Sequence, residues 1–240
     1  MIEVLCASLE GRPPLGLQHV GDHRLRMSRL EPWAVAANRL LDEAAATGNH
    51  ALFIDDDVEI LEGGLDVASE YLPFADVVGV GLLNYGPGVR LQMNGAGCYV
   101  SVGPDNQVVL TPRGDMARLL TPEYVPHVSA SCMFLSANIL KSGVRFPVWE
   151  GAHYEDVAFT LDAWLQGYKV AYVPGCVIHN LTPQGLGQQK AKDPHQMVKR
   201  AINERALHDW MKEANIAVEA LAGTIPARGR PIRATDRRAS

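Results

Sequence analysis

The sequence ALFIDDDVEI, residues 51–60, places an apolar run directly before three aspartates. A short apolar run that ends abruptly in polar residues is typical of a buried parallel strand, which delivers those residues at the carboxyl edge of a sheet. Adjacent carboxylates repel one another, and a bound cation offsets that repulsion. Asp55, Asp56 and Asp57 are therefore the first candidate functional residues, with a solvated turn as an equally good explanation of an isolated acidic run.

Strands and helices are expected to alternate on both sides of this segment. The β-prone residues 2–7 predict an opening strand, and the proline-led, alanine-rich residues 32–46 predict a helix that ends before Gly48. Further elements are expected as helices at 65–72, 137–142, 154–166 and 201–222, strands at 76–83, 125–135 and 169–173, and a hairpin of 98–102 with 107–111. This alternation predicts an α/β sheet.

The composition is that of a globular protein, with 240 residues, 47% apolar and 20% charged. We predict one catalytic domain over residues 1–222 and a basic, disordered tail over residues 223–240. The four cysteines form no CxxC pair, which argues against a zinc knuckle and a disulfide framework. The N-terminus does not resemble a signal peptide, and no stretch is apolar enough to span a bilayer, so a cytoplasmic protein is expected.

A second acidic pair, Glu155 and Asp156, opens the predicted helix at residues 154–166. The helix macrodipole favours acids at a helix N-terminus, which explains this pair without any function. His179 follows the next predicted strand, and a lone histidine is more often structural than a metal ligand. Taken singly, these residues leave both interpretations open.

The order and spacing of these pieces resemble the family 2 glycosyltransferases with the GT-A fold. In that family a helix similar to AANRLLDEAAATG, residues 36–48, precedes an apolar strand that ends in a metal-binding DxD motif, here Asp55 and Asp57. A glycine-containing loop with a short helix, similar to SCMFLSANILKSGVRF, leads to the ED pair in YEDVAFTLDAWLQGYKVAYVP, and His179 looks like the closing histidine. The resemblance covers roughly residues 32–210 and implies a Rossmann-like, mixed, mainly parallel sheet flanked by helices.

The resemblance implies the transfer of a sugar from a nucleoside-diphosphate sugar to an acceptor hydroxyl. Asp55, Asp57 and His179 would hold a divalent cation, Mn²⁺ or Mg²⁺, that neutralises charge on the departing diphosphate. Asp156 would be the general base and Glu155 would orient it or the acceptor, which implies inversion at the anomeric carbon. If Asp156 were only a helix cap, a retaining mechanism would remain open.

Donor contacts are expected at the end of the first strand and around the acidic run. The family has a second strand that ends in an acidic, nucleotide-reading turn, where this chain offers only HRLRMS, residues 23–28, with no clear base-reading aspartate after it. A loop at residues 181–192 is expected to close over the donor. The candidate donor-binding residues are Ser8, Glu10, Arg12, Asn38, Arg39, Asp55 and Asp56, with Arg26, Arg29, Lys190 and Lys192 as candidate phosphate contacts.

The acceptor stays open among glycan, lipid, protein and a hydroxymethylated base of phage-type DNA. The tail carries Arg228, Arg230, Arg233, Arg237 and Arg238 against Asp236 alone, which suits either a solvated end or attraction to nucleic acid or an anionic membrane. Two other functions fit the motifs: a nucleotidyltransferase, which would release pyrophosphate, and a non-catalytic module that binds sugar nucleotides or nucleic acid.

Overall fold

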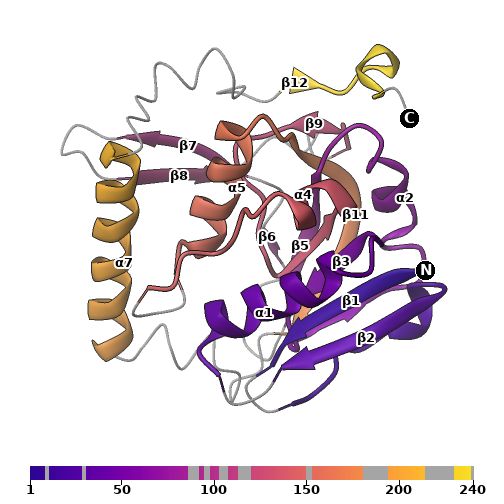
Figure 1. Ribbon diagram of the computed structural model, residues 1–240, viewed down its shortest axis with the longest axis horizontal. Coiled ribbons are helices and arrows are strands. Elements are labelled where there is room, and N and C mark those ends of the chain that lie inside the picture. Colours follow the sequence, from indigo (N-terminus) through magenta and orange to yellow (C-terminus); the bar gives the residue numbers. More distant parts are fainter. Residues whose placement is uncertain are drawn as a thin grey trace.

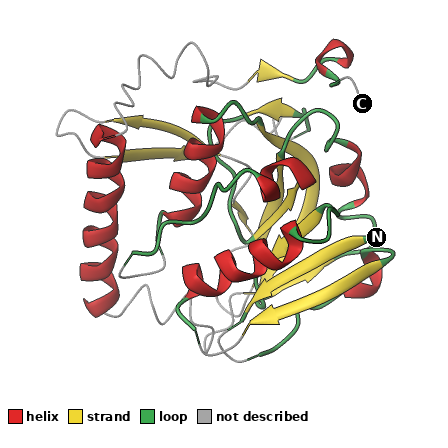
Figure 2. Ribbon diagram, in the orientation of Figure 1, coloured by secondary structure: helices red, strands yellow, loops and turns green. Residues whose placement is uncertain are grey.

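The computed structural model of the chain describes residues 1–8, 11–28, 31–85, 92–94, 98–102, 108–112, 120–149, 153–180, 194–213 and 230–238. They form a large β-sheet with helices packed against it and a separate hairpin (Figures 1 and 2). The strands are β1 (Ile2–Ala7), β2 (His23–Ser28), β3 (Ala51–Ile54), β4 (Val58–Ile60), β5 (Val77–Tyr85), β6 (Gln92–Asn94), β7 (Cys98–Val102), β8 (Val108–Pro112), β9 (Glu123–Tyr124), β10 (Cys132–Leu135), β11 (Val170–Asn180) and β12 (Arg230–Pro231). The helices are α1 (Trp33–Ala45), α2 (Asp66–Glu70), α4 (Ala137–Lys141), α5 (Glu155–Leu165) and α7 (Pro194–Glu213).

Most strands of the large sheet run in one direction. Their order is β12-β9-β11-β5-β10-β3-β1-β2. β1 pairs in parallel with β2 and β3, β5 pairs in parallel with β11, and β10 is inserted antiparallel between β3 and β5. The carboxyl ends of β1, β2, β3, β5 and β11 therefore meet at one edge of the sheet, together with the amino end of β10. The predicted mixed, mainly parallel α/β sheet flanked by helices is confirmed.

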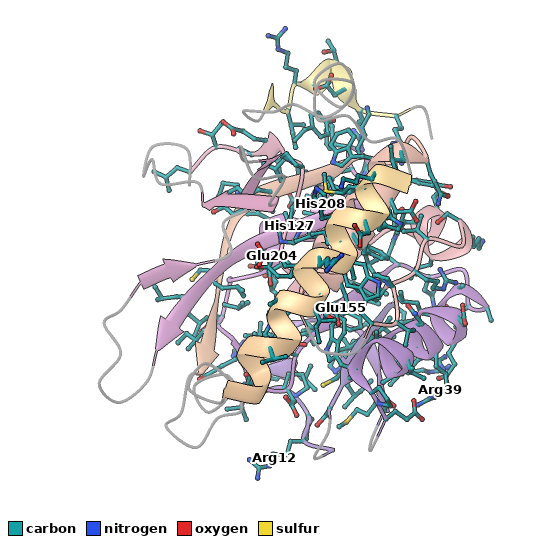
Figure 3. The ribbon with its side chains drawn as sticks, turned by 90° about the vertical axis from the view of Figure 1, so that its left-hand side faces the viewer. Arg12, Arg39, His127, Glu155, Glu204 and His208 are labelled. Carbon is teal, nitrogen blue, oxygen red and sulfur yellow. The ribbon has the colours of Figure 1, made fainter. Side chains whose placement is uncertain are left out.

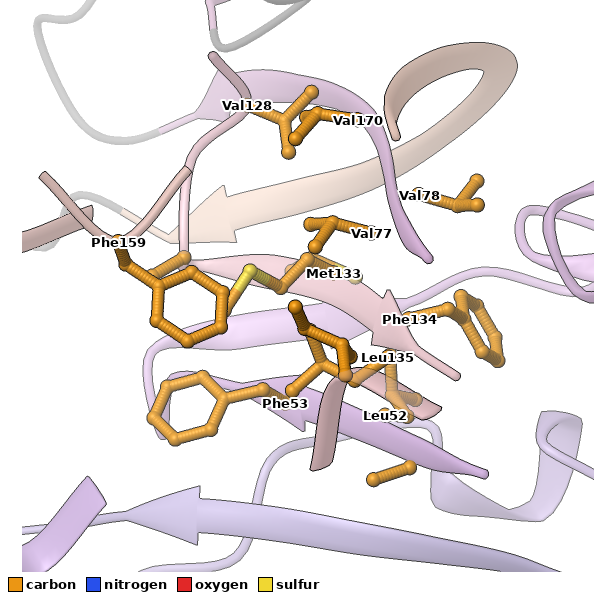
Figure 4. Close-up of a cluster of buried hydrophobic side chains, with 14 of the residues drawn as sticks. Leu52, Phe53, Val77, Val78, Val128, Met133, Phe134, Leu135, Phe159 and Val170 are labelled. Atoms are coloured by element: carbon orange, nitrogen blue, oxygen red, sulfur yellow. The ribbon is translucent and has the colours of Figure 1, made fainter. Parts of the chain in front are cut away.

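The core lies where the central strands meet the helices that cover them (Figure 4). β3 and β10 are buried along their whole length, which explains their uninterrupted apolar sequences, because a strand covered on both faces does not alternate. Phe53 of β3 is in register with Met133 of β10. Phe159 of α5 stacks on Phe146 with ring centroids 4.5 Å apart, and so joins the helix layer to the sheet.

Helix α1 lies on β1 through an alanine-rich stripe. Ala37, Leu40, Leu41 and Ala44 of this helix are buried, at the i, i+3, i+4, i+7 spacing that places side chains on one face. Small alanine side chains allow the helix axis to approach the sheet closely. As a result the N-terminus of α1, at Trp33, is held beside the carboxyl edge of β3.

Three predicted elements have the wrong bounds. The strand expected at 169–173 is only the first part of β11, which continues to Asn180 through an irregularity in its pairing with β5 between Tyr172 and Cys176. The strand expected at 125–135 is regular only in β10, because α5 side chains occupy main-chain groups before it: Trp164 Nε1 donates to Val125 O at 3.0 Å, and Ala130 N donates to Asp156 Oδ2 at 3.3 Å. The last helix begins at Pro194 rather than residue 201, in keeping with the preference of proline for the first helical turn.

The prediction of a disordered tail is wrong for residues 230–238, which fold back onto the domain. Arg230 pairs with Tyr124 to add β12 to the sheet, and Ile232 packs against the core. Arg238 then forms a bidentate ion pair with Asp76, whose side chain is completely buried. The tail therefore ends in an ordered contact with the fold.

No helix within the described ranges is both long and apolar enough to cross a membrane.

Candidate functional site

The acidic run forms a tight turn at the carboxyl edge of the sheet. Asp55 follows the last residue of β3 and its N–H donates to Ser131 O at 3.1 Å, and Val58 N donates back to Asp55 O at 3.3 Å. The chain then enters β4, which pairs antiparallel with β11. The turn is thus fixed from both sides by main-chain hydrogen bonds, while its three aspartates stay partly exposed.

Two of the three carboxylates accept hydrogen bonds from neighbouring side chains. Trp33 Nε1, at the start of α1, donates to Asp55 Oδ1 at 3.4 Å, and the Trp33 ring packs edge-on against Phe53 and Phe146. Ser8, at the end of β1, donates its hydroxyl to Asp56 Oδ2. Each donor fixes the direction of its carboxylate. Asp57 is the residue of the run next to β4.

Ser8 organises the loop that follows β1. Its Oγ accepts hydrogen bonds from Gly11 N at 2.8 Å and Arg12 N at 3.0 Å, while its hydroxyl hydrogen goes to Asp56. Arg12 is exposed and its side chain projects from this edge of the molecule (Figure 3). Ser8 therefore joins Asp56 to the main chain of Arg12, whereas Glu10 lies outside the described residues.

The ED pair enters the same site from the helix layer. Asp156 Oδ2 accepts the N–H of Ala130 at 3.3 Å, and Asp55 donates its N–H to the next residue, Ser131. Since the main chain of Asp55 and the carboxylate of Asp156 are bonded to adjacent residues of one segment, the acidic turn and the start of α5 lie near each other. Sequence separation gave no indication of this bridge, because it runs through main-chain atoms of a third segment.

Glu155 and Asp156 differ in their exposure. The Asp156 side chain is 26% exposed, whereas Glu155 is 3% exposed and lies beneath α7 in Figure 3. Solvent can reach the Asp156 carboxylate, whereas Glu155 is buried. Tyr154, just before the pair, has a φ of 69°, a left-handed conformation that costs free energy for a residue with a side chain and is concentrated at functional sites.

His179 is placed next to the acidic run by strand register. In the pairing of β4 with β11, Val58 is opposite His179, so its main chain lies one residue from Asp57. The side chain of His179 is outside the described part of the structure. The main chain thus agrees with the spatial relation that the motif resemblance implies.

The carboxylate oxygens of the acidic run suit a cation that also binds phosphate oxygens. Among the described residues no three His, Cys, Asp or Glu side chains are grouped to hold a metal ion. A divalent cation that binds a nucleotide diphosphate takes only one or two protein carboxylates and completes its shell with phosphate oxygens and water. Asp55 and Asp57 offer hard oxygen ligands within one turn, so these residues fit such a group.

Several residues that were expected to bind the nucleotide sugar contact other protein residues instead. Asn38 Nδ2 donates to Phe146 O at 2.7 Å and its Oδ1 accepts from Phe146 N at 2.8 Å. Arg26 pairs with the buried Glu3 at 2.6 Å. Both side chains hold the fold together, so neither is retained as a donor-binding candidate. Arg29, Lys190 and Lys192 lie outside the described ranges.

Arg39 belongs to a cluster at the carboxyl end of β2. It donates to Ser28 Oγ at 2.8 Å and pairs with Glu43 at 2.5 Å and Glu31 at 3.5 Å. Residues 23–28 form a complete strand in register with β1, and the acidic residue Glu31 follows it. A second strand with an acid after it is therefore present.

Replacing Asn38 with Ala is expected to lower the free energy of unfolding by about 1–3 kcal/mol, because the main-chain groups of Phe146 lose both partners. Urea unfolding measures this loss. The variant Asn38→Asp keeps the oxygen that accepts from Phe146 N but places its second oxygen against Phe146 O, so it should not recover the loss. A rise in the donor KM with no loss of stability would instead assign Asn38 to donor binding.

Sequence reasoning missed two residues of the site, Trp33 and His127. Trp33 stands at the start of a predicted helix, where an aromatic residue is ordinarily assigned to the core. His127 lies in a segment expected to be a strand, and its Nε2 is 3.8 Å from Asp156 Oδ2. Neither belongs to a recognisable motif, so only the folded structure identifies them.

Comparisons with known proteins give structural similarity alone. No protein-family model and no curated protein sequence matches the chain. Among solved structures, A197 from STIV aligns over 72% of this chain and 82% of its own, with 16% identity and a TM-score of 0.45. GalNAc-T7 with UDP, GalNAc and Mn²⁺ aligns over 77% of this chain and 45% of its own, with 12% identity and a TM-score of 0.44. S. aureus TarS 1-349 aligns over 75% of this chain and 60% of its own, with 16% identity and a TM-score of 0.47. These are distant similarities, and we infer the function of this chain from its own residues.

Proposed function

We propose that this chain is a metal-dependent glycosyltransferase that moves a sugar from a nucleoside-diphosphate sugar to an acceptor hydroxyl. The observation that carries the proposal is the anchoring of Asp55 and Asp156 on the adjacent residues Ser131 and Ala130, at 3.1 and 3.3 Å. It unites an acidic turn, suited to a cation with a diphosphate, and a partly exposed carboxylate, suited to a proton transfer. A GT-A transferase needs both in one site.

Asp156 is the general base of the proposed reaction. Its carboxylate takes the proton of the acceptor hydroxyl while the acceptor oxygen attacks the anomeric carbon and the bond to the diphosphate breaks. Attack from the face opposite the leaving group gives inversion. Glu155, which is buried directly before it, orients the carboxylate. Base catalysis of this kind contributes roughly 100-fold to 10,000-fold to a rate.

Asp57 and Asp55, with His179, would hold a divalent cation, Mn²⁺ or Mg²⁺, that supplies charge neutralisation on the leaving diphosphate. Trp33 keeps Asp55 directed at the turn through its indole N–H. Ser8 and Asp56 hold the loop after β1 in place, and the exposed Arg12 in that loop offers a guanidinium for phosphate. Arg39, Ser28 and Glu31 at the end of β2 are the proposed surroundings of the nucleoside.

The test is release of nucleoside diphosphate from a panel of sugar nucleotides, with and without Mn²⁺. We expect turnover that requires the cation and falls about 100-fold or more in Asp57→Asn, because a metal contributes several kcal/mol of charge stabilisation. Asp22→Asn is the matched control, since Asp22 is 84% exposed and precedes β2 at the opposite edge of the sheet. Metal-independent turnover that Asp57→Asn leaves unchanged would contradict the proposal.

The products of the same assay separate the other candidate functions. A nucleotidyltransferase releases pyrophosphate instead of a nucleoside diphosphate. A binding module retains the nucleotide in equilibrium dialysis and releases no product from any donor. Acceptors to be added are glycans, lipids, proteins and hydroxymethylated DNA, each scored by transfer above the rate of donor hydrolysis.

A further inference from the structure

His127 lies behind the proposed base, on its inner side. The histidine belongs to the segment between β9 and β10 and is 5% exposed. Its Nε2 is 3.8 Å from Asp156 Oδ2, and its Nδ1 is 3.1 Å from Thr160 Oγ1. Thr160 is completely buried and stands one helical turn after Asp156 on α5. The three side chains thus form a row that runs from the core to the edge of the site.

The chemistry of the three groups determines where the protons lie. An ionised carboxylate only accepts hydrogen bonds, so the imidazole nitrogen that faces Asp156 carries the hydrogen. Burial lowers the pKa of His127, against the opposing effect of the negative charge of Asp156, so the ring holds one proton rather than two. Nδ1 then carries no hydrogen and lies 3.1 Å from Thr160 Oγ1, whose hydroxyl also lies 3.0 Å from the main-chain oxygens of Asp156 and Val157.

Two N–H groups face one oxygen of the proposed base. Ala130 N–H donates to Asp156 Oδ2 at 3.3 Å, and Nε2 of the uncharged His127 ring lies 3.8 Å from the same atom, beyond hydrogen-bond distance. The other oxygen, Asp156 Oδ1, accepts the main-chain N–H of Val157 at 2.9 Å. The carboxylate is therefore oriented through both oxygens, while its side chain stays 26% exposed.

We propose that His127 is a positioning residue for Asp156. This inference rests on the proposed function, since it assigns a role to a residue that acts through the general base. His127 does not itself take the proton of the acceptor, because it is buried whereas Asp156 is 26% exposed. The inner donors set the direction of the base and leave the reaction chemistry to Asp156.

The test compares His127→Leu with His127→Gln. Leu removes both ring nitrogens, and we expect kcat to fall about 10-fold to 100-fold, a part of the contribution of a general base, with the donor KM within about threefold of wild type. Gln retains an N–H near the position of Nε2 and should recover part of the loss. His50→Leu is the matched histidine control, because His50 accepts a hydrogen bond from Ala137 N at the opposite edge of the sheet.

A double-mutant cycle with Asp156→Asn separates positioning from general structural support. If His127 acts through Asp156, the double variant His127→Leu/Asp156→Asn is no slower than Asp156→Asn alone. Additive losses, or a wild-type kcat in His127→Leu, would overturn the role assigned to His127. Should His127→Leu fail to fold, His127→Phe, which keeps a planar ring and removes both nitrogens, carries the same cycle.

Failure of this inference is distinguishable from failure of the proposed function. A wild-type chain that releases no nucleoside diphosphate from any donor overturns both. A chain in which Asp156→Asn is slow and His127→Leu is as fast as wild type overturns the positioning role alone. A lower kcat in both Asp156→Asn and His127→Leu, with a double variant no slower than Asp156→Asn, supports the proposed function and the positioning role together.

Discussion

Replacing Asp156 with Asn is expected to lower kcat about 100-fold to 10,000-fold, the range that a positioned general base contributes. Asn keeps the size of the side chain and an oxygen that can accept from Ala130 N, but it cannot take a proton from the acceptor. The donor KM should change little, because the nucleotide and the cation are held by other residues. Steady-state kinetics with varied donor and a saturating acceptor measures both constants.

Asp162→Asn is the control for this loss. Asp162 lies on the same helix, carries the same charge, and accepts a hydrogen bond from Gln166 on the outer surface. If Asp156 served only as an acid at a helix N-terminus, its replacement would cost about 0.3–1 kcal/mol of stability and leave the rate unchanged. A lowered Tm in Asp156→Asn with wild-type turnover would therefore refute its role as base.

Replacing Arg238 with Met is expected to lower the free energy of unfolding by about 3 kcal/mol, because one partner of a buried ion pair is left without the other. Asp76 is completely buried between Ser136, Lys169 N and the guanidinium of Arg238. The hydrogen bonds that Ser136 Oγ and Lys169 N donate to Asp76 remain in the variant, so the loss should lie at the low end of the range for broken buried ion pairs. Guanidinium chloride unfolding, monitored by tryptophan fluorescence, measures the loss.

Arg237→Met provides the comparison, since Arg237 is the exposed neighbour of Arg238 and the charge change is identical. Its unfolding free energy should stay close to wild type, as is usual for exposed charges. The variant Asp76→Asn combined with Arg238→Met should lose less than the sum of the single losses, because the two side chains act as a pair. Equal stabilities of Arg237→Met and Arg238→Met would show that the ion pair contributes nothing.

The ordered end of the chain changes the interpretation of its arginines. Arg238 is engaged with Asp76, and Arg233 N is bonded to Asp236 in the last 3₁₀ turn. A chain end held against the sheet differs from the free basic arm that composition alone predicts. Transfer to hydroxymethylated DNA therefore has to be judged from acceptor assays rather than from tail charge.

Strands and helices of this fold follow from local patterns. The apolar runs of β1 and β3, the alanine-rich α1 and the amphipathic α5 were all predictable within one or two residues, because each must bury an apolar face whatever surrounds it. The predicted bounds were wrong where tertiary contacts compete with strand pairing. Residues 125–131 have a strand-like composition, but two of their main-chain groups form hydrogen bonds with the side chains of Trp164 and Asp156 instead of with a neighbouring strand.

The site divides in the same way. Asp55, Asp57, Glu155, Asp156 and His179 are identifiable from sequence because acids at the end of a buried strand or at the start of a helix form compact motifs. Trp33, Ala130 and His127 are not, because their contribution depends on distances between atoms far apart in the chain. The same holds for Asn38, whose polar side chain suggested a ligand contact and whose partners are two main-chain groups of Phe146.

The sequence by itself determined the acidic run at the end of a buried strand, the acidic start of α5 and the α/β alternation, since each of these depends only on neighbouring residues. The tertiary structure alone decided that Asp55 and Asp156 bond to the adjacent residues Ser131 and Ala130, that His127 lies 3.8 Å from Asp156, and that Arg238 pairs with Asp76. The physical reason is that hydrogen bonds and buried charges are satisfied by partners from any part of the chain, and only packing selects which partners those are.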